Sequence, residues 1–165
     1  PERKETYKLG DVNVSLIQTA MGRTIFVSHD TNLPRPYSRI NLVQGTRGIF
    51  QGYPDRVYTE SRGEGHRWED AEDYYAEFEH PLWSEQGPSA RGAGHGGMDY
   101  IEDYRLIQCL REGLATDMNV YDAAALSAVT PLSEWSVANG SQPVEFPDFT
   151  RGRWQSWPKL SLVTA

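Results

Sequence analysis

The sequence predicts an α+β fold in which an open, mostly antiparallel β-sheet carries helices packed on one face. Alternating apolar and polar residues, the pattern of half-buried strands, dominate residues 11–60. Apolar residues at helical spacing dominate the second half of the chain. Strands that follow one another in this way are typical of an antiparallel meander. With 165 residues and 38% hydrophobic content, the chain is long enough for one domain, which we place at residues 1–165.

A β-hairpin opens this domain. Val12, Val14 and Leu16 alternate with polar residues, and residues 21–23 form a tight turn before a second strand begins at Thr24. The hairpin is therefore predicted from its alternation and its turn together.

A loop at residues 30–36 follows the hairpin, because Pro34 and Pro36 remove ladder donors and hold their predecessors in extended backbone. Strand patterns then resume at residues 37–43, 49–50 and 56–58.

Helical patterns follow at residues 69–79, 98–113 and 121–138. We expect the first of these helices to end at Pro81, and Asp99 to cap the first turn of the second. The second helix carries an apolar stripe, expected to face the core, that consists of Tyr100, Tyr104, Ile107 and Leu110. The remaining residues, 144–165, are rich in proline and aromatic residues and are expected to wrap back over the core.

The composition disfavours nucleic-acid and membrane partners. The formal net charge is -7, no stripe of Lys and Arg stands out, and no apolar stretch approaches the span of a bilayer. The single cysteine, Cys109, cannot form an internal disulfide. The four histidines lack metal-binding spacing, so we expect no metal site.

A glycine run at residues 92–97 formally matches the G-x-G-x-x-G fingerprint of dinucleotide-binding proteins. The fingerprint requires a strand directly before it, and none is predicted there. We therefore expect no cofactor-binding residues in this chain.

His95 is the strongest candidate for ligand contact. It lies among Gly92, Gly94, Gly96 and Gly97, where the backbone can take positive φ and a ligand can approach closely. The competing interpretation is a loop histidine whose nitrogens are satisfied by backbone groups.

Tyr37 is a second candidate, at the predicted start of a strand beside a loop. Taken alone, it favours edge packing over a phenol offered to a substrate. Pairs of carboxylates suited to ordinary glycosidase chemistry arise by chance among 23 acidic residues, and they carry little weight.

A resemblance to a known family connects these residues. In order along the chain, residues 31–48, 94–100, 121–124 and 146–152 resemble the NAD-dependent glycosidases typified by α-N-acetylgalactosaminidase. These enzymes belong to the Gfo/Idh/MocA oxidoreductase-like superfamily. The resemblance covers their carboxy-terminal sheet domain, so we expect the amino-terminal Rossmann domain, which holds NAD, to lie outside these 165 residues and the isolated chain to be inactive.

The resemblance implies a redox route to hydrolysis. NAD oxidises the sugar at C3, the C2 proton becomes acidic, the glycosidic oxygen is eliminated, and water addition followed by reduction restores the sugar. It implies that Tyr37 and His95 bind the carbohydrate substrate, with Tyr37 also the candidate for catalytic proton transfer. Large aromatic residues that could stack on sugar faces are Trp68, Tyr75 and Trp83.

The resemblance also suggests partners and a location. We expect contact with the chain's own Rossmann domain, a homo-oligomer through the sheet face, and a bacterial exported or periplasmic enzyme. Two alternatives stay open. One is the carboxy-terminal domain of an NAD(P)-dependent sugar dehydrogenase, and the other is a non-enzymatic dimerisation or carbohydrate-binding module.

Overall fold

The computed structural model describes residues 10–158, 160 and 162, and it confirms the α+β class. The strands are β1 (Val12–Gln18), β2 (Thr24–Asp30), β3 (Leu42–Gln44), β4 (Gly48–Gln51), β5 (Arg56–Thr59) and β6 (Glu69–Asp70). The helices are α1 (Glu72–Phe78), α2 (Pro81–Ala90), α3 (Met98–Glu112) and α4 (Val120–Ala138), with short 3₁₀ turns η1 (Gly94–Gly97) and η2 (Arg153–Ser156).

The strands form two separate antiparallel sheets rather than the one sheet expected. One contains β1 and β2, with Leu16 opposite Phe26, and the other has the order β3-β4-β5-β6, with Ile49 opposite Tyr58. The predicted hairpin is confirmed. Both sheets are open, as expected.

The predicted strand at residues 37–43 forms only from Leu42 onward. Ile40 takes a positive φ of 47°, and its backbone N–H donates to the Ser38 hydroxyl at 3.1 Å. An extended ladder cannot pass through such a residue. The prediction that Tyr37 begins a strand is therefore wrong, and Tyr37 lies in the loop between β2 and β3.

Three predicted helices are confirmed, and α2 is an addition. The sequence places Pro81 at the end of a helix, whereas it occupies the first turn of α2, where its missing N–H costs nothing. His80 caps this helix, since its Nδ1 accepts from the backbone N–H of Leu82 at 3.1 Å. Pro88 inside α2 made this stretch look like a loop.

Helices α2 and α3 pack against each other, and their buried residues are Ala90, Ile101 and Cys109. This burial corrects the predicted stripe on α3. Tyr100 and Tyr104 are half-buried and stack on each other, while Ile107 and Leu110 are exposed, the latter at 69%. The helix thus packs through a different face and leaves its most apolar stripe uncovered.

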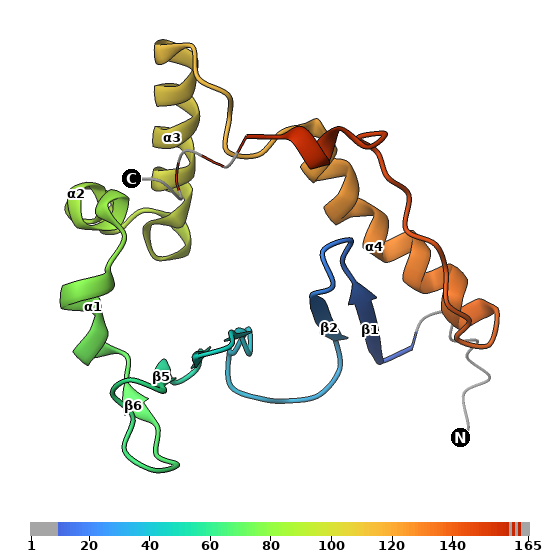
Figure 1. Cartoon of the computed structure of the whole chain (residues 1–165), viewed down its shortest axis with the longest axis horizontal. Helices are drawn as coiled ribbons and strands as arrows, with labels where there is room; N and C mark the ends of the chain where they lie inside the picture. The colour runs from blue at the N-terminus through green and yellow to red at the C-terminus, as the bar shows by residue number, and fades with distance from the viewer. Residues whose placement is uncertain (1–9, 159, 161, 163–165) are drawn as a thin grey trace, which may run out of the picture.

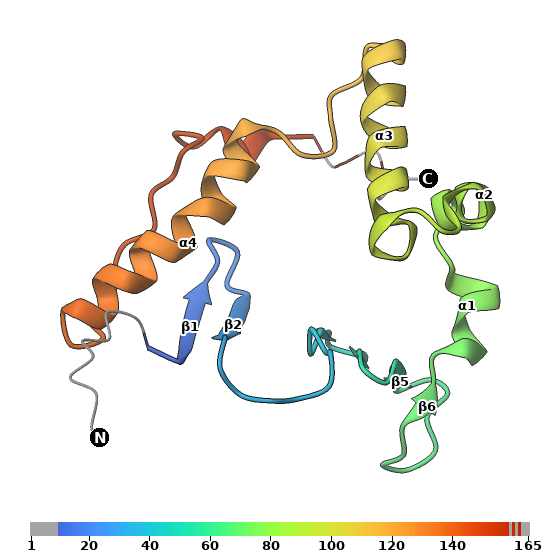
Figure 2. The same cartoon turned by 180° about the vertical axis from the view of Figure 1, so that it is seen from behind.

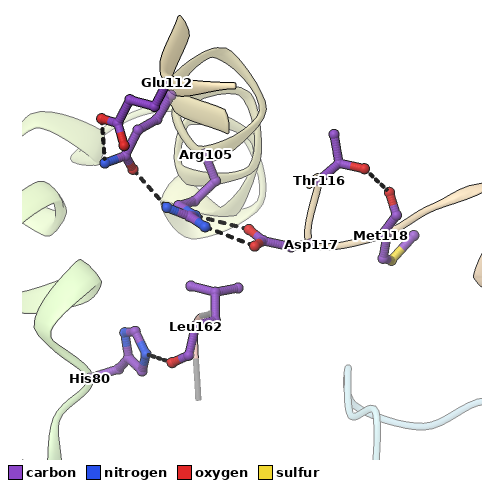
Figure 3. Close-up of polar contacts among 8 residues, drawn as sticks. His80, Arg105, Glu112, Thr116, Asp117, Met118 and Leu162 are labelled. Atoms are coloured by element: carbon purple, nitrogen blue, oxygen red, sulfur yellow. Dashed lines mark hydrogen bonds and ion pairs between the residues drawn. The ribbon is translucent and has the colours of Figure 1, made fainter. Parts of the chain in front are cut away.

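Polar contacts fix the loop between α3 and α4 and tie the carboxy-terminal segment to α2 (Figure 3). Arg105 donates to both carboxylate oxygens of Asp117 at 2.9 and 2.8 Å. His80 Nε2 donates to the carbonyl of Leu162 at 2.8 Å. From the end of α4, the chain runs back along that helix, where Trp157 meets Tyr121 edge-on (Figure 1). The predicted wrapping segment includes residues 159, 161 and 163–165, which lie outside the described residues.

In both views α1, α2 and α3 lie on one side and α4 on the other, with the strands below and between them (Figures 1 and 2). The chain has an accessible surface of 13948 Å², whereas a compact monomer of its 18.7 kDa mass exposes about 8,300 Å². No residue of α4 is buried along its length, and the hairpin residues Leu16 and Phe26 are 73% and 64% exposed on one face. Much apolar surface therefore has no cover within the described part of the chain.

Candidate functional site

The glycine loop between α2 and α3 holds His95 in an uncommon backbone conformation. His95 has φ 50° and ψ 40°, and Gly96 and Gly97 follow with φ of 73° and 101°. The left-handed region costs a non-glycine residue on the order of 1 kcal/mol or more. A Cβ at Gly97 would lie only 3.0 Å from the Cβ of Ala90, so this glycine lets the loop close onto α2.

Asp99 binds His95 instead of capping α3. The His95 Nδ1 lies 2.9 and 3.0 Å from the two carboxylate oxygens of Asp99. The cap position belongs to Gly97, which makes no side-chain cap, so the predicted capping role of Asp99 is wrong. The physical reason is that α3 begins at Met98, so Asp99 lies inside its first turn and not at the cap position, and the glycine loop brings the His95 ring to its carboxylate.

Both side chains of this pair are open to solvent, at 67% for His95 and 55% for Asp99. The ring nitrogen Nε2 has no partner among the residues that the structure describes. The geometry therefore offers one imidazole nitrogen to a ligand while a carboxylate holds the other. The alternative of a histidine satisfied by backbone groups is not what the structure shows.

Tyr37 is exposed in its loop, and Arg39 holds its phenol. The Arg39 Nε donates to the Tyr37 hydroxyl at 2.7 Å, and this bond raises the pKa of the Arg39 guanidinium. The Tyr37 ring also meets Tyr53 edge-on, at 5.8 Å between centroids. These contacts orient a phenol that no neighbouring strand supports.

Arg39 also links the Tyr37 loop to the start of α3. Its Nη1 lies 3.9 Å from the Met98 sulfur, and Met98 follows His95 by three residues. The structure thus brings the two predicted site residues to the same region through Arg39. Sequence reasoning missed Arg39 and the pairing role of Asp99, because the left-handed backbone at residues 95–97 that brings the His95 ring to Asp99 has no helical spacing to reveal it.

Two hollows in the described surface lie away from these residues. One, of about 460 Å³, lies between the four-stranded sheet and α1 and is lined by residues that include Phe50, Val57, Arg62, Tyr74, Tyr75 and Phe78. The other, of about 550 Å³, is lined by Tyr121, Phe149, Arg151 and Arg153. Neither is lined by Tyr37 or His95, so the candidate site is an open surface rather than a closed pocket.

The predicted sugar-stacking aromatics are dispersed. Trp68 carries the Arg56 guanidinium over its ring at 4.4 Å, and Trp83 lies on α2. Tyr75 lines the first hollow, where its hydroxyl donates to Asp55 at 2.9 Å. Burial, together with this carboxylate, raises the pKa of Tyr75 to about 12. Within the described residues these side chains do not gather beside His95 as one platform.

The glycine run does not fit a dinucleotide. The fingerprint needs a strand directly before it, and the element that precedes residues 92–97 is helix α2. Within residues 10–158, 160 and 162, no group of three or more His, Cys, Asp and Glu side chains is placed to hold a metal ion. Among the same residues, no helix is both long and apolar enough to cross a membrane.

Comparison with known proteins gives one consistent family. The family model described as "Glycosyl hydrolase 109, C-terminal domain" matches residues 1–156. A "Glycosyl hydrolase family 109 protein" of Solibacter usitatus is 57% identical over 160 residues, which cover 94% of this chain and 36% of the relative. One from Shewanella amazonensis is 53% identical over 161 residues, covering 95% and 35%. The chain thus spans about a third of the length of the curated relatives it matches.

Proposed function

Because the chain belongs to the glycosyl hydrolase 109 family as its C-terminal domain, we propose that it forms the substrate-facing wall of an NAD-dependent glycoside hydrolase of the α-N-acetylgalactosaminidase type. The observation that carries this proposal is the pair of exposed, oriented polar groups at one region of the surface. Asp99 holds His95 by one ring nitrogen, and Arg39 holds Tyr37 while reaching to Met98.

In this proposal the two side chains bind sugar hydroxyls. The free Nε2 of His95 forms one hydrogen bond, and the Tyr37 phenol forms another. Tyr37 is also the candidate for proton transfer, because Arg39 donates to its oxygen and leaves its own proton available to the substrate. No carboxylate dyad is required, since NAD-dependent glycosidases are an exception to the two-carboxylate rule.

The proposal places NAD on the part of the enzyme that lies outside this chain, because the chain's own glycine run does not fit it. The redox chemistry belongs to that cofactor. The contribution of the present residues is to bind and orient the sugar.

We further propose that the uncovered apolar surface docks against the polypeptide that precedes this chain. The matched family model is a C-terminal domain, and the relatives are nearly three times as long, so the remaining sequence lies on the amino-terminal side. An isolated two-stranded ribbon is marginally stable, and β1–β2 stands alone in its sheet. The excess exposed area, about 5,600 Å² on this chain alone, is at least as large as the total area that obligate interfaces bury on both partners, about 2,000–5,000 Å² or more.

A product assay on the full-length enzyme tests the proposed reaction. With an aryl α-N-acetylgalactosaminide, we expect the free aglycone to accumulate over many turnovers without a matching rise in reduced nicotinamide, which is followed at its own absorbance. Reduced cofactor formed in step with sugar consumption, with no aglycone released, would identify a sugar dehydrogenase and contradict the proposal. Sedimentation of the same enzyme separates docking within one polypeptide from a homo-oligomer through the sheet face.

A further inference from the structure

We infer that Asp99 is a positioning residue that fixes the ring orientation and tautomer of His95, so that Nε2 faces the sugar as a hydrogen-bond acceptor. This inference rests on the proposed function and assigns the chemistry of its histidine. Asp99 itself touches no substrate in this account.

The geometry of the His95–Asp99 pair determines which ring nitrogen carries the proton. Both Asp99 oxygens lie within 3.0 Å of the His95 Nδ1, and a carboxylate can only accept, so Nδ1 carries a proton. A neutral imidazole has one N–H, and with that proton on Nδ1 its lone pair is on Nε2. The nitrogen that is free in the structure is therefore the accepting one.

The glycine loop at residues 94–97 makes the His95–Asp99 pair possible. The backbone of His95 is in the left-handed region, which turns its side chain back toward the first turn of α3. A Cβ at Gly94 would collide with Asp99 Oδ2, so the absence of a side chain there leaves space for the carboxylate. Gly94 does not have a positive φ, so a glycine is needed here for the room it leaves beside Asp99 and not for its backbone conformation.

The group that this nitrogen would bind is a sugar hydroxyl. A free Nε2 lone pair accepts from a hydroxyl, and a sugar offers hydroxyl donors in fixed directions on a rigid ring. An acceptor held in one orientation selects among those directions. The sugar hydroxyl that donates to Nε2 is thus recognised by position, and freeing the ring to rotate weakens that recognition.

The test compares three variants of the full-length enzyme. Asp99→Ala removes the acceptor, Asp99→Asn keeps an acceptor oxygen without the charge, and Gly94→Ala pushes the intact carboxylate aside. Partners that fix the second nitrogen of a metal-binding histidine are worth about 10- to 100-fold in affinity or activity. We expect a loss of about that size in kcat/KM for Asp99→Ala, a similar direction for Gly94→Ala, and a smaller loss for Asp99→Asn.

Two matched controls separate this role from general damage. Asp103→Asn removes an exposed carboxylate one turn further along α3, and Gly87→Ala adds a methyl group in α2 where the nearest atom is 3.8 Å away. We expect both to keep wild-type kcat/KM. Melting temperatures of all five variants confirm that each is folded.

Nitrogen-15 NMR of the His95 ring gives a readout that a merely structural role would not move. We expect the Nδ1–H tautomer in the wild type, and a change toward Nε2–H, which free histidine prefers, in Asp99→Ala and Gly94→Ala. If His95→Ala lowers turnover while the Asp99 variants keep the wild-type tautomer and kcat/KM, the inference is overturned and the proposed site stands. If His95→Ala itself has wild-type turnover, the proposed site fails and the inference fails with it.

Discussion

The helices α2 and α3 and the hairpin β1–β2 are both well-formed, but only the helices bury their apolar residues within this chain. Ala90, Ile101 and Cys109 lie buried where α2, η1 and α3 meet. In the hairpin, Leu16 and Phe26 face solvent although their register is regular. Helices α2 and α3 therefore pack against each other, whereas the hairpin is regular in its local structure but has no element that covers its apolar face.

The difference shows which part of the chain supplies its own stability. The loop that carries His95 is anchored on the packed region, through Gly97 against Ala90. The hairpin, α4 and the side of α3 that carries Ile107 and Leu110 present apolar side chains to solvent. In our account, the remaining enzyme covers these surfaces and completes the site beside His95 and Tyr37.

The largest effect is expected in the β1–β2 hairpin, whose exposed apolar face we propose to be covered in the full-length enzyme. Phe26→Ala should destabilise the full-length enzyme by about 3–5 kcal/mol, the cost of truncating a buried phenylalanine. In the isolated 165-residue chain the same change should stay within about 0.5 kcal/mol, because the ring is exposed there. Denaturant unfolding of both proteins measures the contrast, and equal small losses in both would mean that no partner covers the hairpin.

The packed region should respond in the opposite way. Ile101→Ala should cost about 2–5 kcal/mol in the isolated chain and in the full-length enzyme alike, because Ile101 is already buried within this chain, on a helix that packs against α2. The same unfolding experiment measures both values. A loss confined to the full-length enzyme would show that α2 and α3 do not pack in the isolated chain.

The two regions also differ in what the sequence predicts about them. The hairpin follows from alternation and a short turn, both local signals, and its second strand begins at Thr24 as expected. Helix α2 was missed because Pro81 and Pro88 are read as breakers, although Pro81 suits a first turn.

The packing face of α3 could not be predicted from periodicity alone. The stripe ending at Leu110 is the most apolar, yet the buried residues of the helix are Ile101 and Cys109. Periodicity identifies an apolar face of a helix but does not show which other element packs against it. The candidate residues His95 and Tyr37 were found from glycine context and resemblance, whereas the groups that hold them, Asp99 and Arg39, depend on contacts that only the structure gives.

A pH titration tests the burial of Tyr75, which lies on α1 beside the four-stranded sheet. The pKa of Tyr75 is raised from 10.0 to about 12, first by burial and then by its bond to Asp55. The neutral phenol is favoured in the folded state, so its stabilising contribution is complete below pH 10 and is lost as pH rises toward 12. Ultraviolet titration should show Tyr75 among the phenols that ionise late, beside Tyr74, whose pKa is raised by its hydrogen bond to Glu69. Tyr75→Phe should reduce the amplitude of the late step, and an unchanged amplitude would mean that Tyr75 does not contribute to it.

The smallest expected signal concerns NAD. Calorimetric titration of the isolated chain should show no measurable binding, because the glycine run follows a helix and not a strand. The full-length enzyme under the same conditions is the positive control. Micromolar affinity of the isolated chain for NAD would contradict the assignment of the cofactor to the preceding polypeptide.

The most direct test of the account is to measure kcat/KM and the melting temperature of His95→Ala beside His66→Ala, an exposed loop histidine, in the full-length enzyme. We expect His95→Ala to lose on the order of 100-fold in kcat/KM while its melting temperature stays close to that of the wild type, and we expect His66→Ala to change neither value. A His95→Ala enzyme that melts earlier yet retains full turnover in its folded fraction would contradict it, because His95 would then stabilise the glycine loop without binding the sugar.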